Sequence, residues 1–188
     1  MKTLRLAIFI VVALVHVSVP ASVMWNRERT LRHGRVWKFR TAPVDPVDAI
    51  RGRYIALRFA AEIAPPQVEV SDRSIKPDTL VYVSLKEDAD GFAQIDQISE
   101  TVLRGDNIVT AETGYWAQNA PRVHFPFDRY WVTEKNAAAA ERAYIENSRE
   151  QKQNAYVTVR VRDGDATLEQ LYIDGQPLPE YLRAHPPK

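Results

Sequence analysis

The sequence predicts a mainly β fold of the α+β class: a single N-terminal transmembrane helix, then one β-rich domain with one clear helix near residues 136–149. Two observations predict it. An apolar run close to the N-terminus is long enough to cross a bilayer. After it, apolar and polar residues alternate with a period of two in several short stretches that Gly, Pro, Asn and Asp separate, which is typical of strands joined by turns.

The bulk composition bounds the size of the domain and excludes several kinds of site. Of 188 residues, about 160 remain once the apolar run is set aside, which is close to the commonest domain size. The 25 basic and 24 acidic residues leave a net charge of +1, which argues against a nucleic-acid surface. The absence of cysteine excludes disulfides, thiol catalysis and cysteine metal ligands. We therefore expect a membrane anchor over residues 1–26 and one domain over residues 27–188.

The anchor is predicted from the apolar stretch of residues 6–25, which follows the basic residues Lys2 and Arg5. A helix needs about 20 apolar residues to cross the hydrocarbon core, and Trp25 would then lie in the interfacial belt. The competing interpretation is a cleaved signal peptide, which would use the small residue Ala21 at its cleavage site. We favour the uncleaved anchor, in contact with the lipid bilayer, because the apolar run is longer than the core of a typical signal peptide.

The charges on the two sides of the anchor bear on its orientation. Lys2, Arg5 and the terminal amine favour a cytoplasmic N-terminus, whereas four arginines between positions 27 and 35 pull the other way. Large domains cross the membrane largely regardless of such charges, and the N-terminal layout is that of a signal. We therefore expect a single-pass protein of the inner (cytoplasmic) membrane with its C-terminal domain on the periplasmic or extracytoplasmic side.

The elements of the domain are predicted from periodicity and from turn-forming residues. Residues 27–34 form a short helical extension that Gly34 closes. The helix at residues 136–149 begins with four successive alanines, which Asn136 can cap. Residues 101–116 are ambiguous. Strands are expected at residues 35–41, 54–61, 79–85, 92–98, 123–127, 129–133, 156–162 and 166–173.

The most specific segment is a polar turn that runs directly into a strand. Asp45, Pro46 and Asp48 form the turn, since proline fixes φ and both carboxylates can accept hydrogen bonds from nearby backbone N–H groups. Gly52 then allows a positive φ or the close approach of another segment. From Tyr54 onward the chain alternates as a half-buried strand. The side chains that share one face are Ile55, Leu57, Phe59 and Ala61.

This segment resembles the signature of the GDYXXLXYXF family. Arg53 stands where the signature has Asp, Phe59 where it has Tyr, and Ala61 where it ends in Phe. Residues 127–134 and 171–178 are similar to further stretches of the same family. The residues that carry the resemblance are Asp45, Pro46, Asp48, Arg51, Gly52, Tyr54, Leu57 and Phe59.

The resemblance implies an architecture and a setting, but no reaction. Members of the family are membrane-anchored bacterial proteins without a known activity, and they tend to be encoded beside multi-pass membrane proteins. The resemblance therefore implies that a multi-pass membrane protein is the partner of this chain.

No catalytic, cofactor-binding or metal-binding residues are predicted. The four histidines, at positions 16, 33, 124 and 185, are too scattered for a metal motif. Ser71, Ser74 and Lys76 are the one arrangement that suggests nucleophilic catalysis, with the lysine activating a serine. A loop this polar does not desolvate a lysine, which argues against the pair.

The aromatic side chains between residues 115 and 131 are the candidate surface for a protein partner. Tyrosine and tryptophan are enriched in interface hot spots. Packing in the core is the interpretation that we favour for the cluster, because aromatic rings supply much of the buried area of a β domain. The candidate contacts are Tyr115, Trp116, Tyr130 and Trp131.

Three functions are compatible with these observations. We favour a membrane-anchored extracytoplasmic interaction module of unknown biochemical activity, which acts as an accessory partner of a multi-pass membrane protein. The first alternative is a membrane-anchored serine/lysine-type hydrolase or peptidase. The second is a cleaved periplasmic ligand-binding protein.

Overall fold

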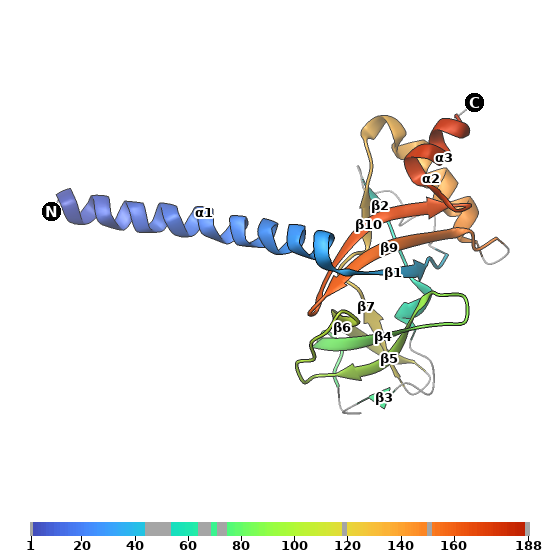
Figure 1. Ribbon diagram of the computed structural model, residues 1–188, viewed down its shortest axis with the longest axis horizontal. Coiled ribbons are helices and arrows are strands. Elements are labelled where there is room, and N and C mark those ends of the chain that lie inside the picture. The colour runs from blue at the N-terminus through green and yellow to red at the C-terminus, as the bar shows by residue number, and fades with distance from the viewer. Residues whose placement is uncertain are drawn as a thin grey trace.

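The computed structural model describes residues 2–43, 54–63, 69–70, 75–117, 120–149 and 152–186. In these residues the chain forms a long N-terminal helix followed by a strand-rich α+β part (Figure 1). The elements in chain order are α1 (Lys2–His33), β1 (Arg35–Arg40), β2 (Tyr54–Ala56), the 3₁₀ helix η1 (Ala60–Glu62), β3 (Glu69–Val70), β4 (Leu80–Glu87), β5 (Ala93–Ser99), β6 (Ile108–Ala117), β7 (Ala120–His124), β8 (Arg129–Trp131), α2 (Glu134–Ser148), β9 (Ala155–Arg162), β10 (Asp165–Ile173), β11 (Gln176–Pro177) and α3 (Leu178–Ala184).

Helix α1 projects from the strand-rich part as a single rod (Figure 1). Its section Ile8–His33 has the length and composition to cross a membrane. The mean hydropathy of its most apolar part is 2.2, and none of that part is buried against the rest of the described chain. A signal sequence shares these properties. Pro20 lies inside the helix without ending it. The helical extension predicted at residues 27–34 is therefore the last part of the same continuous helix.

A tight joint links α1 to the sheet. The helix ends at His33, and the N–H of Gly34 donates to the carbonyl of Thr30 at 2.8 Å. Strand β1 begins at the very next residue. A Cβ atom on Gly34 would lie 2.5 Å from the Thr30 carbonyl oxygen and 3.0 Å from that of Val161 on β9. Only glycine fits between helix and sheet at this point, and α1 therefore passes directly into β1 without a linker.

The described strands form three sheets. Their strand orders are β1-β9-β10-β11, β2-β8 and β3-β5-β4-β6-β7. All pairs are antiparallel except β3 with β5. Helices α2 and α3 contact β10 on the side of the molecule away from α1 (Figure 1). Isolated bridges add links at Thr41–Phe59, Ile63–Arg122 and Val109–Gly164.

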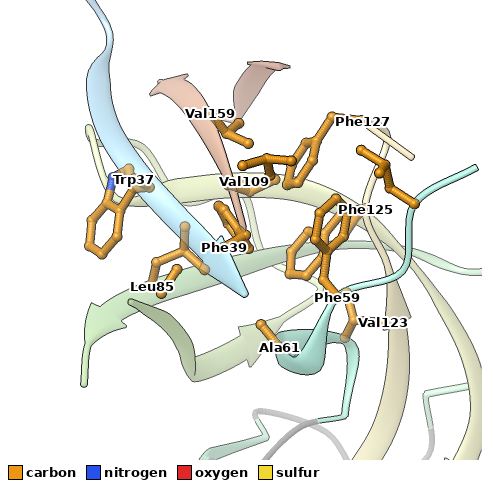
Figure 2. Close-up of a cluster of buried hydrophobic side chains, with 14 of the residues drawn as sticks. Trp37, Phe39, Phe59, Ala61, Leu85, Val109, Val123, Phe125, Phe127 and Val159 are labelled. Carbon is orange, nitrogen blue, oxygen red and sulfur yellow. The ribbon is translucent and has the colours of Figure 1, made fainter. Parts of the chain in front are cut away.

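Four phenylalanines from three segments form a cluster in the hydrophobic core (Figure 2). Phe39 lies on β1, Phe59 follows β2, and Phe125 and Phe127 lie between β7 and β8; none is more than 4 % exposed. The ring centroid of Phe39 lies 5.7, 5.3 and 5.0 Å from those of the other three, in edge-on geometry. Such pairs contribute about 0.5–1.5 kcal/mol each beyond their burial. This phenylalanine cluster therefore fastens β1 and the segment after β2 to the β7–β8 connection.

Most predicted strands are confirmed, and the exceptions have local causes. The strand expected at residues 54–61 is regular only over Tyr54–Ala56, after which Ala60–Glu62 turns as η1. Its inward face is nonetheless as predicted, because the four alternating side chains from Ile55 to Ala61 are all buried. The strand expected at residues 123–127 ends at His124, since the two phenylalanines that follow turn into the core.

The helices differ more from the sequence-based expectation. Helix α2 begins at Glu134 with Thr133 as its N-cap, so Asn136 lies within the first turn and does not cap it. Helix α3 was not expected, because seven residues are too few to show a helical period. It is held by Leu178, which is 1 % exposed.

The substitution Gly34→Ala is expected to lower the free energy of unfolding by about 1–3 kcal/mol, because the added methyl group overlaps two backbone carbonyls. Thermal unfolding of the detergent-solubilised chain, followed by circular dichroism, measures the effect. The control is His33→Ala, since the exposed side chain of His33 predicts a change below about 0.5 kcal/mol. Equal stability of the two variants would show that the joint is not tightly packed.

Candidate functional site

The signature segment divides between the core and the surface. Leu57 and Phe59 are each 1 % exposed, and the N–H of Leu57 donates to the carbonyl of Asp128 at 2.7 Å. Tyr54 is half-buried at the surface. The remaining signature residues lie outside the described part of the chain: Asp45, Pro46, Asp48, Arg51 and Gly52.

Strand β2 positions β8. Tyr54 pairs with Trp131, and Ala56 pairs with Arg129. The ring centroids of Tyr54 and Trp131 lie 5.2 Å apart, and the guanidinium carbon of Arg129 lies 5.2 Å from the Tyr54 ring centroid. Trp131 is nonetheless 64 % exposed. Strands β2 and β8 together present two aromatic rings and a cation at the surface, which we call the aromatic ledge (Tyr54, Arg129 and Trp131).

The aromatic ledge borders a hollow of about 660 Å³ at the base of α1, which we call the foot hollow. Helix α1 contributes Val23, Arg27 and Thr30 to its wall. The other walls are β8 with the residues that lead into it and the first residues of β10. Because Val23 belongs to the apolar stretch, the hollow opens at the level where the chain would leave a bilayer.

The four aromatic candidates for partner contact do not form one face. Trp131 belongs to the aromatic ledge, while the neighbouring Tyr130 is half-buried and its hydroxyl accepts a hydrogen bond from Gln170 at 3.1 Å. Tyr115 is 81 % exposed, but it lies on β6 in a different sheet. The indole N–H of Trp116 donates to a backbone carbonyl at 2.9 Å. The exposed aromatic candidates are therefore spread over two sheets.

Glu62 is a buried carboxyl group that the sequence pattern did not reveal. It lies in η1, is 9 % exposed, and sits 3.8 Å from the guanidinium of Arg58. Burial raises the pKa of Glu62 to about 7, although the charge of Arg58 pulls it down. Phe59 and Ala61 point inward, so a strand with regular alternation would direct the side chain of residue 62 outward. The turn of η1 brings it inward instead.

The other chemical candidates do not assemble into a centre in the described part of the chain. There, no group of three or more His, Asp or Glu side chains could hold a metal ion. Ser71 and Ser74 lie outside the described residues, so the serine–lysine alternative, against which the sequence argues, is not tested. The Nδ1 atom of His16 lies 2.8 Å from the carbonyl oxygen of Val12, within its own helix.

A family model described as GDYXXLXY protein matches residues 16–171. The chain belongs to the GDYXXLXY protein family. No curated protein and no solved structure matches it. The matched region begins inside α1 and ends in β10, so it takes in the joint, the aromatic ledge and the foot hollow of this GDYXXLXY protein. The resemblance drawn from residues 45–59 is thereby confirmed, and the match shows no activity.

The stability of this GDYXXLXY protein is expected to fall as the pH rises from 5 to 8. The pKa of Glu62 is about 7 in the fold, above its ordinary value of 4.5, so the folded chain binds the proton more tightly. The resulting stabilisation is complete below about pH 4.5 and is lost as the pH rises through 7. Its full size is at most about 3 kcal/mol.

Urea unfolding at pH 5, 6.5 and 8 measures this effect. The variant Glu62→Gln is expected to match the natural chain at pH 5 and to exceed its stability at pH 8. The control is Glu180→Gln, because Glu180 is exposed on α3 and its replacement should leave the pH dependence unchanged. A pH dependence that persists in Glu62→Gln would assign it to other groups.

Phe59→Ala and Tyr54→Ala separate the two roles of the signature strand. Phe59→Ala is expected to lower the free energy of unfolding by about 3–5 kcal/mol, because it removes a buried ring that packs against Phe39 and Phe127. Tyr54→Ala removes a half-exposed ring and is expected to cost about 1 kcal/mol. Denaturant unfolding measures both. If Tyr54→Ala lowered the free energy of unfolding as much as Phe59→Ala, the Tyr54 ring would act as part of the core and not as part of a surface ledge.

Proposed function

We propose that this GDYXXLXY protein is a membrane-anchored, extracytoplasmic interaction module and an accessory partner of a multi-pass membrane protein. Residues 1–26 are its anchor in the inner membrane, and residues 27–188 are its extracytoplasmic domain. The observation that carries the proposal is the joint at Gly34, where a continuous apolar helix meets the sheet without a linker. Such a joint suits a protein that must hold one surface at a set height above a membrane.

The joint keeps the domain close to the bilayer. Trp25, at the end of the apolar stretch, is 73 % exposed, which suits a side chain of the interfacial belt. From Trp25 to Gly34 the helix rises only about 14 Å. Partners that the base of the domain can reach must therefore lie at the membrane surface themselves.

The apolar part of α1 is exposed on all sides, so other membrane components can contact it. None of its most apolar window is buried against the rest of the described chain. Ser18 and Ser22 each donate their hydroxyl proton to a carbonyl of their own helix, at 3.1 and 2.7 Å. Small side chains of this kind allow close approach of a neighbouring transmembrane helix. The anchor is thus able to pack against a multi-pass partner.

The aromatic ledge offers the contact outside the bilayer. Trp131 is exposed while Tyr54 backs its ring, so its position is set before a partner binds. Tryptophan, tyrosine and arginine are the residue types that dominate interface hot spots. The basic residues Lys2 and Arg5 support a cytoplasmic N-terminus, which leaves the ledge on the opposite side of the membrane.

Photo-crosslinking in native membranes tests the proposal. A photoreactive phenylalanine analogue in place of Trp131 is expected to capture a multi-pass membrane protein, and the same analogue at Tyr115 tests the second exposed aromatic position. The control position is Val102, which is apolar, 60 % exposed and outside the ledge. Capture at Val102 equal to that at Trp131 would contradict the proposal.

The variant Trp131→Ala is expected to reduce the co-purified partner at least tenfold, the effect of losing one hot-spot side chain. The matched control is Val102→Ala, which should leave recovery of the partner unchanged.

An alkaline carbonate wash of the membranes should leave the full chain in the pellet. Its release into the soluble fraction would instead favour a cleaved, ligand-binding protein.

A further inference from the structure

The foot hollow lies at the depth of lipid headgroups when α1 spans a bilayer. Measured along the helix from Trp25, Val23 lies about 3 Å toward the hydrocarbon, whereas Arg27 and Thr30 lie about 3 and 7.5 Å beyond it. The headgroup layer on each side of a bilayer is about 5–7 Å thick. Val23, Arg27 and Thr30 all line the hollow. Its wall therefore runs from the edge of the hydrocarbon through the headgroup layer.

Charges of both signs face this hollow. Arg27 and Asp165 both line it, and neither makes an ion pair or a side-chain hydrogen bond with any residue in the described part of the chain. A second pair, Arg129 and Asp128, lies on the same wall with 3.6 Å between nitrogen and oxygen, and both side chains are about half exposed. The two carboxylates would repel a purely anionic ligand as the two guanidinium groups attract it. A ligand with one positive and one negative group can pair with the carboxylates and with the guanidinium groups at the same time.

Two threonine side chains line the same hollow. Thr30 is 2 % exposed and Thr167 is 6 % exposed, and both belong to its wall. Within the described residues, neither side chain forms a hydrogen bond. Their hydroxyl oxygens are not among the fully buried polar atoms of the described chain, so they are open to the hollow and can donate to a polar ligand. Ester and phosphate oxygens of a lipid are acceptors for such hydroxyls.

The volume of about 660 Å³ lies within the range of small-molecule sites. We propose that the foot hollow binds the headgroup of a zwitterionic phospholipid, with its phosphate at Arg27 and Arg129 and its ammonium at Asp165 and Asp128. The acyl chains descend along the exposed apolar side chains of α1 below Val23. The assignment rests on the membrane anchoring proposed above, and it adds a ligand of defined chemistry.

The chemistry of the carboxylates selects among zwitterionic lipids. A primary ammonium donates charge-assisted hydrogen bonds to a carboxylate, whereas a trimethylammonium has no N–H group to donate. The hollow therefore favours phosphoethanolamine over phosphocholine. Phosphoglycerol lacks the positive charge altogether and leaves Asp165 without a partner.

Native mass spectrometry of the full chain, released from nanodiscs that hold equal parts of phosphatidylethanolamine, phosphatidylcholine and phosphatidylglycerol, tests the proposal. The natural chain is expected to retain one phosphatidylethanolamine in preference to the other two. The double variant Arg27→Gln/Asp165→Asn should retain at least tenfold less of it, since it loses two charge-assisted contacts. The matched control is Arg104→Gln/Glu180→Gln, which changes one exposed residue of each sign away from the hollow.

The single variants give a sharper readout than loss of binding. Asp165→Asn is expected to shift the retained lipid from phosphatidylethanolamine toward phosphatidylglycerol, because only the ammonium contact is lost. Arg27→Gln should weaken retention of both lipids alike. Unchanged thermal unfolding of each variant establishes that its fold is intact.

Three outcomes would overturn the proposal. One is retention of the three lipids in equal amounts, and another is a preference for phosphatidylglycerol in the natural chain. The third is a preference for phosphatidylethanolamine that Asp165→Asn leaves unaltered. In each of these cases the chain still pellets with carbonate-washed membranes, so the anchored module stands and the lipid assignment alone fails. A chain that the wash releases overturns both.

Discussion

The contact of Gly34 with Thr30 and Val161 determines how the strand-rich part of the molecule is joined to helix α1. It is a contact between backbones, so no side-chain rotation can relax it. Arg160 strengthens it by donating to the Gly34 carbonyl at 3.3 Å while also pairing with Glu169 at 3.0 Å. The last turn of α1 is thereby linked to β9 and β10, the two central strands of the four-stranded sheet. The position of the aromatic ledge and the walls of the foot hollow both follow from this link.

Two of the three signature residues that the structure describes belong to the core. Leu57 and Phe59 are buried, and Phe59 belongs to the cluster that joins β1 to the β7–β8 connection. The signature has tyrosine at this position, and phenylalanine suits this chain because a hydroxyl group buried there would need its own hydrogen-bond partner. Tyr54 is the described exception, since its ring faces outward against Trp131. One short strand therefore both seals the core and shapes the surface.

The fold followed from the sequence wherever its cause was local. Alternation over β1, β4, β5, β9 and β10 and the apolar run of α1 each carry their own signal, and all six elements are present as expected. The foot hollow has no such signal, because it brings Arg27, Asp128 and Asp165 together from distant parts of the chain. The burial of Glu62 could not be predicted from the sequence for a different reason. A single 3₁₀ turn reversed the direction that alternation gives it.

In the anchored arrangement proposed above, the direct joint at Gly34 makes the orientation of the domain depend on the thickness of the bilayer. Transmembrane helices tilt by about 20° on average, and they tilt further when their apolar length exceeds the local hydrocarbon thickness. A flexible tether would absorb that rotation. With Gly34 packed against β9, the sheet must rotate together with the helix, and Trp131 rotates with the sheet. Membranes of different thickness would therefore present the same aromatic side chain to a neighbour at different angles.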